Sequence, residues 1–262
     1  MLLKDKNAVI YGAGGAIGGA VARAFAREGA SVFLTGRTLA KLAALAGELT
    51  AAGGAAQAAQ VDALDPQAVE QHLEAIVKQA GRIDISFNAI GIRGDLQGTP
   101  LVEMPWENFT TPVLTGIKTH FLTATAAARH MLKNKSGVIL TLSSTSAGLS
   151  GRDRRYHLTG GFSTACAAIE AFSRSLAGEL GTKGIRVICL RPDAIPETWS
   201  AEHRDDSSGS GLKAHMENGT ALGRLPKLEE VANAAVFLAS DRASAMTGTI
   251  LNLSCGSIMD MN

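Results

Sequence analysis

A glycine-rich turn at residues 12–19 follows a short apolar run near the start of the chain. The run Ala8-Val-Ile-Tyr11 is typical of a buried strand, and a helical pattern follows the turn. Small residues in such a turn let backbone N–H groups approach a phosphate at the helix N-terminus. We therefore predict that the turn binds the pyrophosphate of a dinucleotide. The alternative is a tight turn without a ligand. The predicted contact residues are Gly12, Gly14, Gly15, Ala16, Ile17 and Gly18.

The end of the next apolar run bears on which dinucleotide fits. In dinucleotide-binding folds an acidic residue at this point binds the adenosine ribose and would repel a 2′-phosphate. This chain has Gly36 there and Arg37 directly after it. Gly36 removes the repulsion, and the Arg37 guanidinium can pair with a phosphate, so NADP(H) is favoured over NAD(H). A surface arginine that starts a helix is the alternative interpretation.

Short apolar runs alternate with longer amphipathic stretches along nearly the whole chain. Such runs, apolar on both faces, are typical of parallel strands covered by helices on both sides. The predicted fold is therefore α/β, a doubly wound Rossmann-type three-layer sandwich, in one domain over residues 1–262. We expect strands at 7–11, 31–35, 83–88, 138–143, 185–190 and 249–253, and helices at about 16–28, 39–52, 66–80, 106–133, 162–180 and 228–239.

Two polar segments interrupt this alternation. Residues 151–161 are short, basic and bounded by glycines, and residues 196–219 are polar, with Ser and Gly in the middle. Both are expected to be loops that follow the carboxyl ends of strands, where open α/β sheets bind ligands. A long irregular segment in a compact domain is most often a lid or binding loop, so 196–219 is interpreted as a substrate lid.

Composition excludes several classes of protein. The 25 Lys and Arg residues nearly balance 24 Asp and Glu, which argues against a nucleic-acid partner, and 46% of residues are hydrophobic, which argues against disorder. Cys166, Cys189 and Cys255 show no disulfide or zinc spacing, and no metal site is predicted. No apolar run is long enough to span a membrane. We expect a cytoplasmic protein that acts on a small molecule.

Several short motifs also occur in a fixed order. They are the GxxxxxG turn at 12–18, Val61-Asp62 before a helix, the strand end from Asp84 through Asn88 to Gly91, Leu142-Ser143-Ser144, the helix at 167–180, Ile185-Arg-Val187 before Arg191-Pro192, residues 222–226 and 237–240, and Thr247-Gly248. Their order resembles the short-chain dehydrogenase/reductase family over essentially the whole chain. The resemblance implies a parallel sheet of about seven strands, an NAD(P) cofactor, and a homodimer or homotetramer assembled through the two long central helices.

The same resemblance assigns roles to individual residues. Asp62 would bind near the adenine, Asn88 and Gly91 would line the ribose side of the cofactor, and Pro192 would also contact it. The alternative for Asp62 is a strand end without a ligand, and the alternative for Asn88 is a strand cap. Ser144 would hydrogen-bond the substrate's carbonyl oxygen.

Two residues that the family uses for proton transfer are missing. Members usually carry a tyrosine that exchanges the proton and, four residues later on the same helix face, a lysine that lowers its pKa. The register of the helix puts Phe162 and Cys166 at these positions, and Gly116 at the position of a supporting asparagine. Neither Phe162 nor Cys166 can replace the usual acid and its cationic neighbour.

Two hypotheses follow. In the first, the protein is an NADP(H)-dependent oxidoreductase that acts on a small carbonyl, alcohol or activated alkene, with another acid as proton donor. Tyr156 is the leading candidate, because it lies 12 residues after Ser144 on a glycine-bounded loop, and Lys118 is expected to face the same cleft. An exposed basic loop without a catalytic role is the alternative for Tyr156. In the second hypothesis, the fold binds a dinucleotide without turnover, as a sensor or scaffold.

Overall fold

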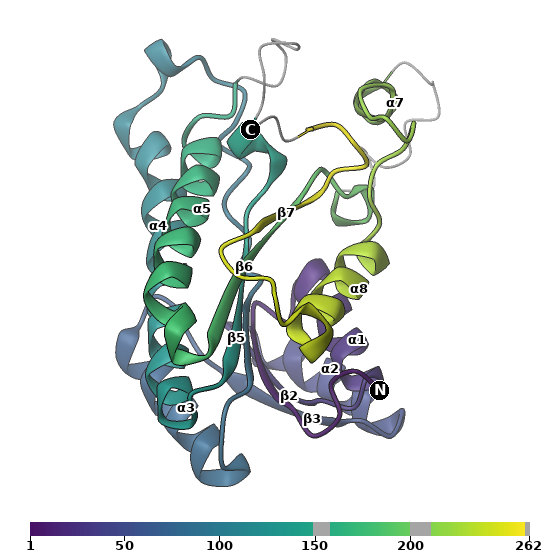
Figure 1. Ribbon diagram of the computed structural model, residues 1–262. Helices are drawn as coiled ribbons and strands as arrows, with labels where there is room; N and C mark the ends of the chain where they lie inside the picture. The colour runs from purple at the N-terminus through teal and green to yellow at the C-terminus, as the bar shows by residue number, and fades with distance from the viewer. Residues whose placement is uncertain (149–157, 200–210, 260–262) are drawn as a thin grey trace.

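The computed structural model describes residues 1–148, 158–199 and 211–259, and it shows a parallel seven-stranded sheet between two layers of helices (Figure 1). The strand order is β3-β2-β1-β4-β5-β6-β7. The strands are β1 (Asn7–Tyr11), β2 (Ser31–Gly36), β3 (Ala55–Gln60), β4 (Ile85–Asn88), β5 (Gly137–Leu142), β6 (Ile185–Pro192) and β7 (Ile250–Leu253). The predicted doubly wound α/β fold is confirmed. The chain crosses from β3, at one edge of the sheet, to β4 beside β1, which places a switch point between β1 and β4.

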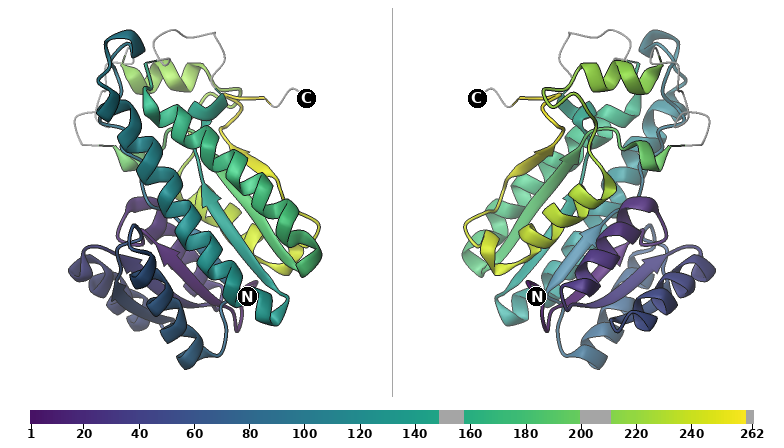
Figure 2. Two further views of the ribbon diagram at one scale, coloured as in Figure 1. Left: turned by 90° about the vertical axis from the view of Figure 1, so that its left-hand side faces the viewer. Right: turned by 90° about the vertical axis from the view of Figure 1, so that its right-hand side faces the viewer.

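Both faces of the sheet are buried, as its apolar runs predict. In β1, Ala8 and Ile10 pack into one hydrophobic cluster, whereas Val9 and Tyr11 pack into another on the opposite face. Helices α1, α2 and α8 cover the first face, and α3, α4 and α5 cover the second (Figure 2). The helices in the described residues are α1 (Ala16–Arg27), α2 (Leu39–Ala51), α3 (Pro66–Ala80), α4 (Trp106–Asn134), α5 (Gly161–Leu180), α7 (Leu212–Asn218) and α8 (Leu228–Ala239).

Local signals explain where several helices begin and end. Asp65 is the N-cap of α3, and its carboxylate accepts hydrogen bonds from the backbone N–H groups of Gln67 and Ala68. Pro66 occupies the first helical position, and Gly81 ends the helix with a φ of 83°. Thr38 is the N-cap position of α2, as predicted, although its side chain makes no capping hydrogen bond.

Two expectations about secondary structure are wrong. The strand list omitted β3, whose sequence Ala-Ala-Gln-Ala-Ala-Gln lacks the β-branched and aromatic residues that mark strands. It forms because each of its residues pairs with β2 at the edge of the sheet. The segment 196–219 was expected to be irregular, but it contains the 3₁₀ turn η5 (Pro196–Thr198) and helix α7.

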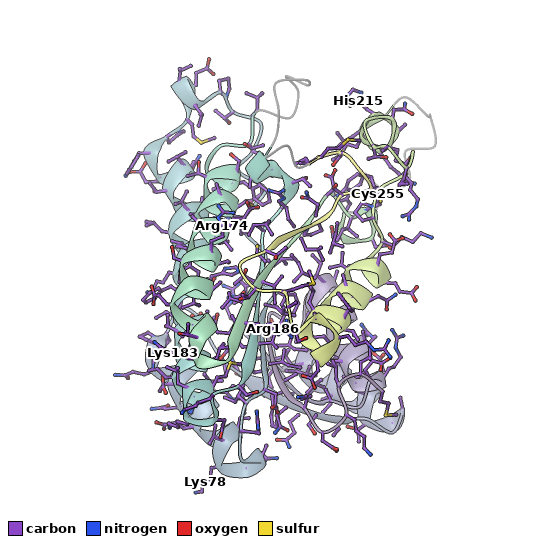
Figure 3. All side chains as sticks on the ribbon, viewed as in Figure 1. Lys78, Arg174, Lys183, Arg186, His215 and Cys255 are labelled. Atoms are coloured by element: carbon purple, nitrogen blue, oxygen red, sulfur yellow. The ribbon has the colours of Figure 1, made fainter. Side chains whose placement is uncertain are left out.

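The parallel register brings the carboxyl ends of the strands to one edge of the sheet. Tyr11 pairs with Thr35 on one side and with Asn88 on the other, so the segments that follow β1, β2 and β4 are neighbours. The labelled side chains in Figure 3 show where the two ends of the strands lie. Cys255, after β7, lies near this edge together with His215 of α7, whereas Arg186, at the start of β6, lies toward the opposite end. The residues predicted to bind ligand are therefore expected at the Cys255 end.

Candidate functional site

The turn between β1 and α1 is built so that only glycine fits at two of its positions. Gly12 has a φ of 76°, and a Cβ added to it would lie 2.8 Å from the carbonyl oxygen of Ala89. A Cβ on Gly18 would overlap the carbonyl oxygen of Gly12. These close approaches fold the turn tightly against β4 and bring the start of α1 to the edge of the sheet.

The first turn of α1 fits an anionic ligand. Gly15 is the N-cap and supplies no side-chain hydrogen bond to the helix, and no acidic residue lies in the first turn, which begins with Ala16 and Ile17. Uncapped N–H groups at a helix N-terminus attract anions because of their direction and the helix dipole. The turn, which includes Gly14, therefore fits the pyrophosphate of a dinucleotide.

Two basic side chains, one after β2 and one in α2, lie on the side of the phosphate turn that faces β2. Arg37 is exposed directly after the strand, and its carbonyl oxygen accepts a hydrogen bond of 3.1 Å from Gln60 Nε2. Within the described residues, no carboxylate pairs with the Arg37 guanidinium. Lys41 of α2 borders the phosphate turn, with its Cβ 3.5 Å from the position that a Cβ of Gly14 would occupy. Lys41 was not singled out from the sequence, although it lies four residues after Arg37.

Asp62 and Asn88 take part in local structure. Asp62, exposed just after β3, accepts a hydrogen bond of 3.0 Å from the Leu64 N–H group. Asn88 is buried, donates from Nδ2 to Thr123 Oγ1 at 3.0 Å and accepts from the Ile90 N–H group at 3.0 Å. The amide of Asn88 therefore fixes the strand end, while the Asp62 carboxylate belongs to an exposed turn. Gly91 is exposed, and nothing lies within 4 Å of the position that its Cβ would take.

Both proton-transfer positions lie at the start of α5, and one of them, Cys166, contacts Ser144 after β5. Phe162 lies in the first turn of α5 and is half-buried, and Cys166 follows one turn later and is fully buried. The Cys166 thiol hydrogen-bonds with the backbone of Ser144, but burial outweighs this and raises the pKa of the thiol to about 12. Cys166 is therefore a neutral thiol next to Ser144, and Phe162 has no proton to exchange. The Ser144 hydroxyl oxygen accepts from the Ser146 N–H group at 3.4 Å.

Gly116, at the position of the supporting asparagine, lies where α4 packs against α5. A Cβ on Gly116 would lie 3.5 Å from Ala165 of α5, so α4 and α5 are in close contact here. The Gly116 carbonyl oxygen accepts from Thr119 Oγ1 at 3.0 Å and from His120 Nδ1 at 2.9 Å. Lys118 is exposed and lies about 200° around α4 from Gly116, so the two residues lie on different faces of this helix.

Beneath Ser144 lies a buried polar network that the sequence did not reveal. The Ser143 hydroxyl donates to Glu170 Oε1 at 2.8 Å, and Arg191 Nη1 lies 3.3 Å from Glu170 Oε2. Arg191 Nε also donates to Asn252 Oδ1 at 2.6 Å. Glu170 and Arg191 are 5% and 8% exposed, so a buried ion pair joins α5 to β6. Pro192, the last residue of β6, is buried beside this network and pairs with Leu253.

Tyr156 and residues 200–210 of the predicted lid lie outside the described residues. The described part of residues 196–219 contains Trp199, which is half-buried, and helix α7. Among the residues that the structure describes, no group of three or more His, Cys, Asp or Glu side chains could hold a metal ion. None of the described helices combines the length and apolar character needed to cross a membrane.

Comparison with known proteins agrees with this arrangement. A family model described as enoyl-(acyl carrier protein) reductase matches residues 12–257. The chain is 32% identical over 259 residues to the Escherichia coli 3-oxoacyl-(acyl-carrier-protein) reductase FabG, covering 99% of this chain and 100% of that protein. A short-chain type dehydrogenase/reductase from Mycobacterium ulcerans superposes with a TM-score of 0.88 at 27% identity, covering 98% of this chain and 91% of that one. The chain belongs to the short-chain dehydrogenase/reductase family.

Other members of this oxidoreductase family are similar along their full length. An L-rhamnose 1-dehydrogenase (NAD(P)(+)) from Azotobacter vinelandii is 33% identical over 266 residues, covering 100% of both chains. A gluconate 5-dehydrogenase from Burkholderia cenocepacia, solved with NADP and tartrate, has a TM-score of 0.85 at 26% identity, covering 97% of this chain and 96% of that one. These names describe different substrates, so membership fixes the class of reaction and leaves the substrate open.

Proposed function

We propose that the protein is an NADP(H)-dependent oxidoreductase that acts on a small carbonyl, alcohol or activated alkene. The preference for NADP(H) is supported by the two basic residues beside the phosphate turn, Arg37 and Lys41. It is also supported by glycine at position 36, where an acidic residue would repel a 2′-phosphate. Gly12, Gly14, Gly15, Ala16, Ile17 and Gly18 would hold the pyrophosphate, Asp62 would contact the adenine, and Asn88, Gly91 and Pro192 would shape the rest of the cofactor site.

A bound nicotinamide cofactor supplies or accepts the hydride. The chain's own contribution is to orient the substrate and to exchange a proton. Among the described residues, the Ser144 hydroxyl acts only as an acceptor, from the Ser146 N–H group, so its hydrogen would donate to a substrate oxygen. Residues 196–219 would close over the substrate as a lid.

Binding of the two cofactors tests the first part of the proposal. Arg37→Ala should weaken NADP⁺ binding about 10- to 100-fold, because a charge-assisted hydrogen bond contributes about 1.5–3 kcal/mol, and should leave NAD⁺ binding within twofold. Isothermal titration calorimetry of both nucleotides measures this. Arg27→Ala, which removes an exposed arginine at the other end of α1, is the matched control and should change neither value. If Arg37→Ala weakened the binding of NAD⁺ as much as that of NADP⁺, the proposed contact between Arg37 and the 2′-phosphate would be contradicted.

We further propose that Tyr156 is the proton donor. Removing a general acid typically costs roughly 10²- to 10⁴-fold in rate, so a replacement for the missing tyrosine at position 162 is expected. Tyr156→Phe should lower substrate-dependent NADPH oxidation at least tenfold without changing NADPH affinity. Phe162→Leu, which keeps position 162 without an acid, should retain most of the activity. Unchanged turnover in Tyr156→Phe would remove Tyr156 from the mechanism.

The alternative function is a dinucleotide-binding sensor or scaffold without turnover. Its support is the pair Phe162 and Cys166, neither of which exchanges a proton near neutral pH. A screen of aldehydes, ketones, alcohols and activated alkenes decides between the two. Cofactor binding without oxidation of NADPH by any carbonyl or alkene, and without reduction of NADP⁺ by any alcohol, would favour the sensor.

We propose that the protein assembles as a homodimer or homotetramer through α4 and α5. Leu114 and Phe121 of α4 are 61% and 52% exposed, and the Phe121 ring lies 5.9 Å from that of Phe172 on α5. Exposed apolar side chains grouped on neighbouring helices are typical of a protein interface. A cytoplasmic location is also proposed, because Cys166, Cys189 and Cys255 are all free thiols.

A further inference from the structure

Asp193 follows Pro192 directly and lies at the carboxyl end of β6. The strand order reverses between β1 and β4, and a dinucleotide lies across such a switch point with one nucleotide over each half of the sheet. The phosphate turn and Arg37 belong to the half built from β1, β2 and β3. The nicotinamide nucleotide therefore falls to the half built from β4, β5 and β6, which is the half that carries Asp193.

Three donors fix the carboxylate of Asp193. Oδ1 accepts from Thr145 Oγ1 at 3.0 Å and from the Ala194 N–H group at 2.7 Å, and Oδ2 accepts from the Ser257 hydroxyl. Thr145 directly follows Ser144, so the carboxylate lies on the Ser144 side of the site. A charge held in this way cannot move away to be solvated elsewhere.

A tight turn presents Ser257 to Asp193. The Ser257 N–H group donates to the Ser254 carbonyl oxygen at 3.1 Å, and the two residues between them have φ values of 52° and 82°. Two successive positive φ values are typical of a type I′ turn, which has little conformational freedom. The turn begins directly after β7, whose last residue, Leu253, pairs with Pro192, so Ser257 is held in one place relative to the end of β6.

Cations near Asp193 are engaged elsewhere. Arg191, two residues earlier, pairs with Glu170, and Arg224 pairs with Glu230 at 2.6 Å. Within residues 1–148, 158–199 and 211–259, no cation forms an ion pair with Asp193. Among the residues that the structure describes, the charge of Asp193 is therefore not neutralised by an ion pair.

We propose that Asp193 makes this site prefer the oxidised cofactor, whose nicotinamide ring is positively charged, over the reduced cofactor, whose ring is neutral. The inference rests on the proposed function, since it requires that a nicotinamide dinucleotide binds. A fixed negative charge attracts the cationic ring through a medium of intermediate dielectric and leaves the affinity of the neutral ring nearly unchanged. Asp193 is thereby a residue that sets which redox form of the cofactor the protein retains.

Equilibrium binding to Asp193→Asn tests the proposal without a substrate. Asparagine has nearly the same shape and can keep the contacts to Thr145, Ala194 and Ser257, so the variant removes the charge alone. We expect the Kd of NADP⁺ to rise about fivefold and the Kd of NADPH to stay within twofold. The Kd of 2′-phospho-ADP-ribose, which has the same phosphates and no nicotinamide ring, should also stay within twofold.

Two controls separate a local charge effect from other causes. Asp241→Asn removes a carboxylate that pairs with Lys6 and is 91% exposed in its side chain, so it changes the net charge equally and should not alter any of the three Kd values. Raising the salt concentration should narrow the difference between NADP⁺ and NADPH in the wild type more than in Asp193→Asn. Equal weakening of all three ligands in Asp193→Asn, or no change in any, would overturn the inference while NADP(H) binding stands. A wild type that binds neither NADP⁺ nor NADPH would instead refute the proposed function.

Discussion

Replacing Gly18 with valine is expected to weaken NADP⁺ binding at least 100-fold. Any side chain at this position would overlap the Gly12 carbonyl oxygen, and it would come within 3.0 Å of Ala13 Cα. Because these atoms belong to the backbone, the turn must open or α1 must shift, and either movement takes the first-turn N–H groups away from the pyrophosphate. Titration of NADP⁺ followed by calorimetry measures the loss, and circular dichroism checks that the variant is folded.

Gly47→Val provides the matched control for this substitution. Gly47 lies in α2, and nothing lies within 4 Å of the position of its Cβ, so the same side chain should be accommodated there and binding should stay within twofold. A folded Gly18→Val protein that binds NADP⁺ within threefold of the wild type would show that the phosphates lie elsewhere.

Replacing Glu170 with alanine is expected to lower the free energy of unfolding by about 3 to 5 kcal/mol. The carboxylate is buried between α5 and β6, where it accepts from Ser143 and pairs with Arg191. Removal of one member of a buried ion pair leaves the other charge in a poorly solvated place, which costs about this much. Urea unfolding, monitored by fluorescence and by circular dichroism, gives the value.

An exposed ion pair provides the comparison. Glu48 pairs with Arg23 at 2.7 Å, but both side chains are about half exposed, so Glu48→Ala should leave the unfolding midpoint within experimental error. Equal unfolding midpoints for Glu170→Ala and Glu48→Ala would show that the buried pair does not hold α5 against the sheet.

The sequence was sufficient to predict the elements whose signals are local. Buried apolar runs marked β1 and β2, and Asp65 with Pro66 marked the start of α3, because hydrophobic period and capping depend on neighbouring residues. Strand β3 escaped detection because its alanines pack at a half-exposed edge that only the pairing with β2 creates. Helix α7 was missed because it is only seven residues long, which is too short for its apolar residues to show a helical period within a polar segment.

The site divides in the same way. The phosphate turn and Arg37 could be predicted, since they follow directly from strands that the sequence reveals. Lys41 could not, because its approach to Gly14 depends on how α2 packs beside the turn. Glu170 and Arg191, 21 positions apart, meet only when α5 lies across β6, and no local spacing encodes such a contact. Tyr156 remains a prediction, since it lies outside the described residues.

The imidazole of His120 has a consequence for stability in acid. Its Nδ1 donates to Gly116, which leaves Nε2 as the acceptor of the Leu142 N–H group at 3.4 Å, so the neutral ring joins α4 to the last residue of β5. Burial lowers the pKa of His120 to about 4 from an ordinary value of 6.5. The unfolded chain therefore takes up a proton first as the pH falls below about 6.5, and the folded state progressively loses this stabilisation down to about pH 4. The contact between α4 and the end of β5, just before Ser144, thus depends on a His120 ring that is uncharged at neutral pH. Acidification protonates this ring and destabilises the folded protein.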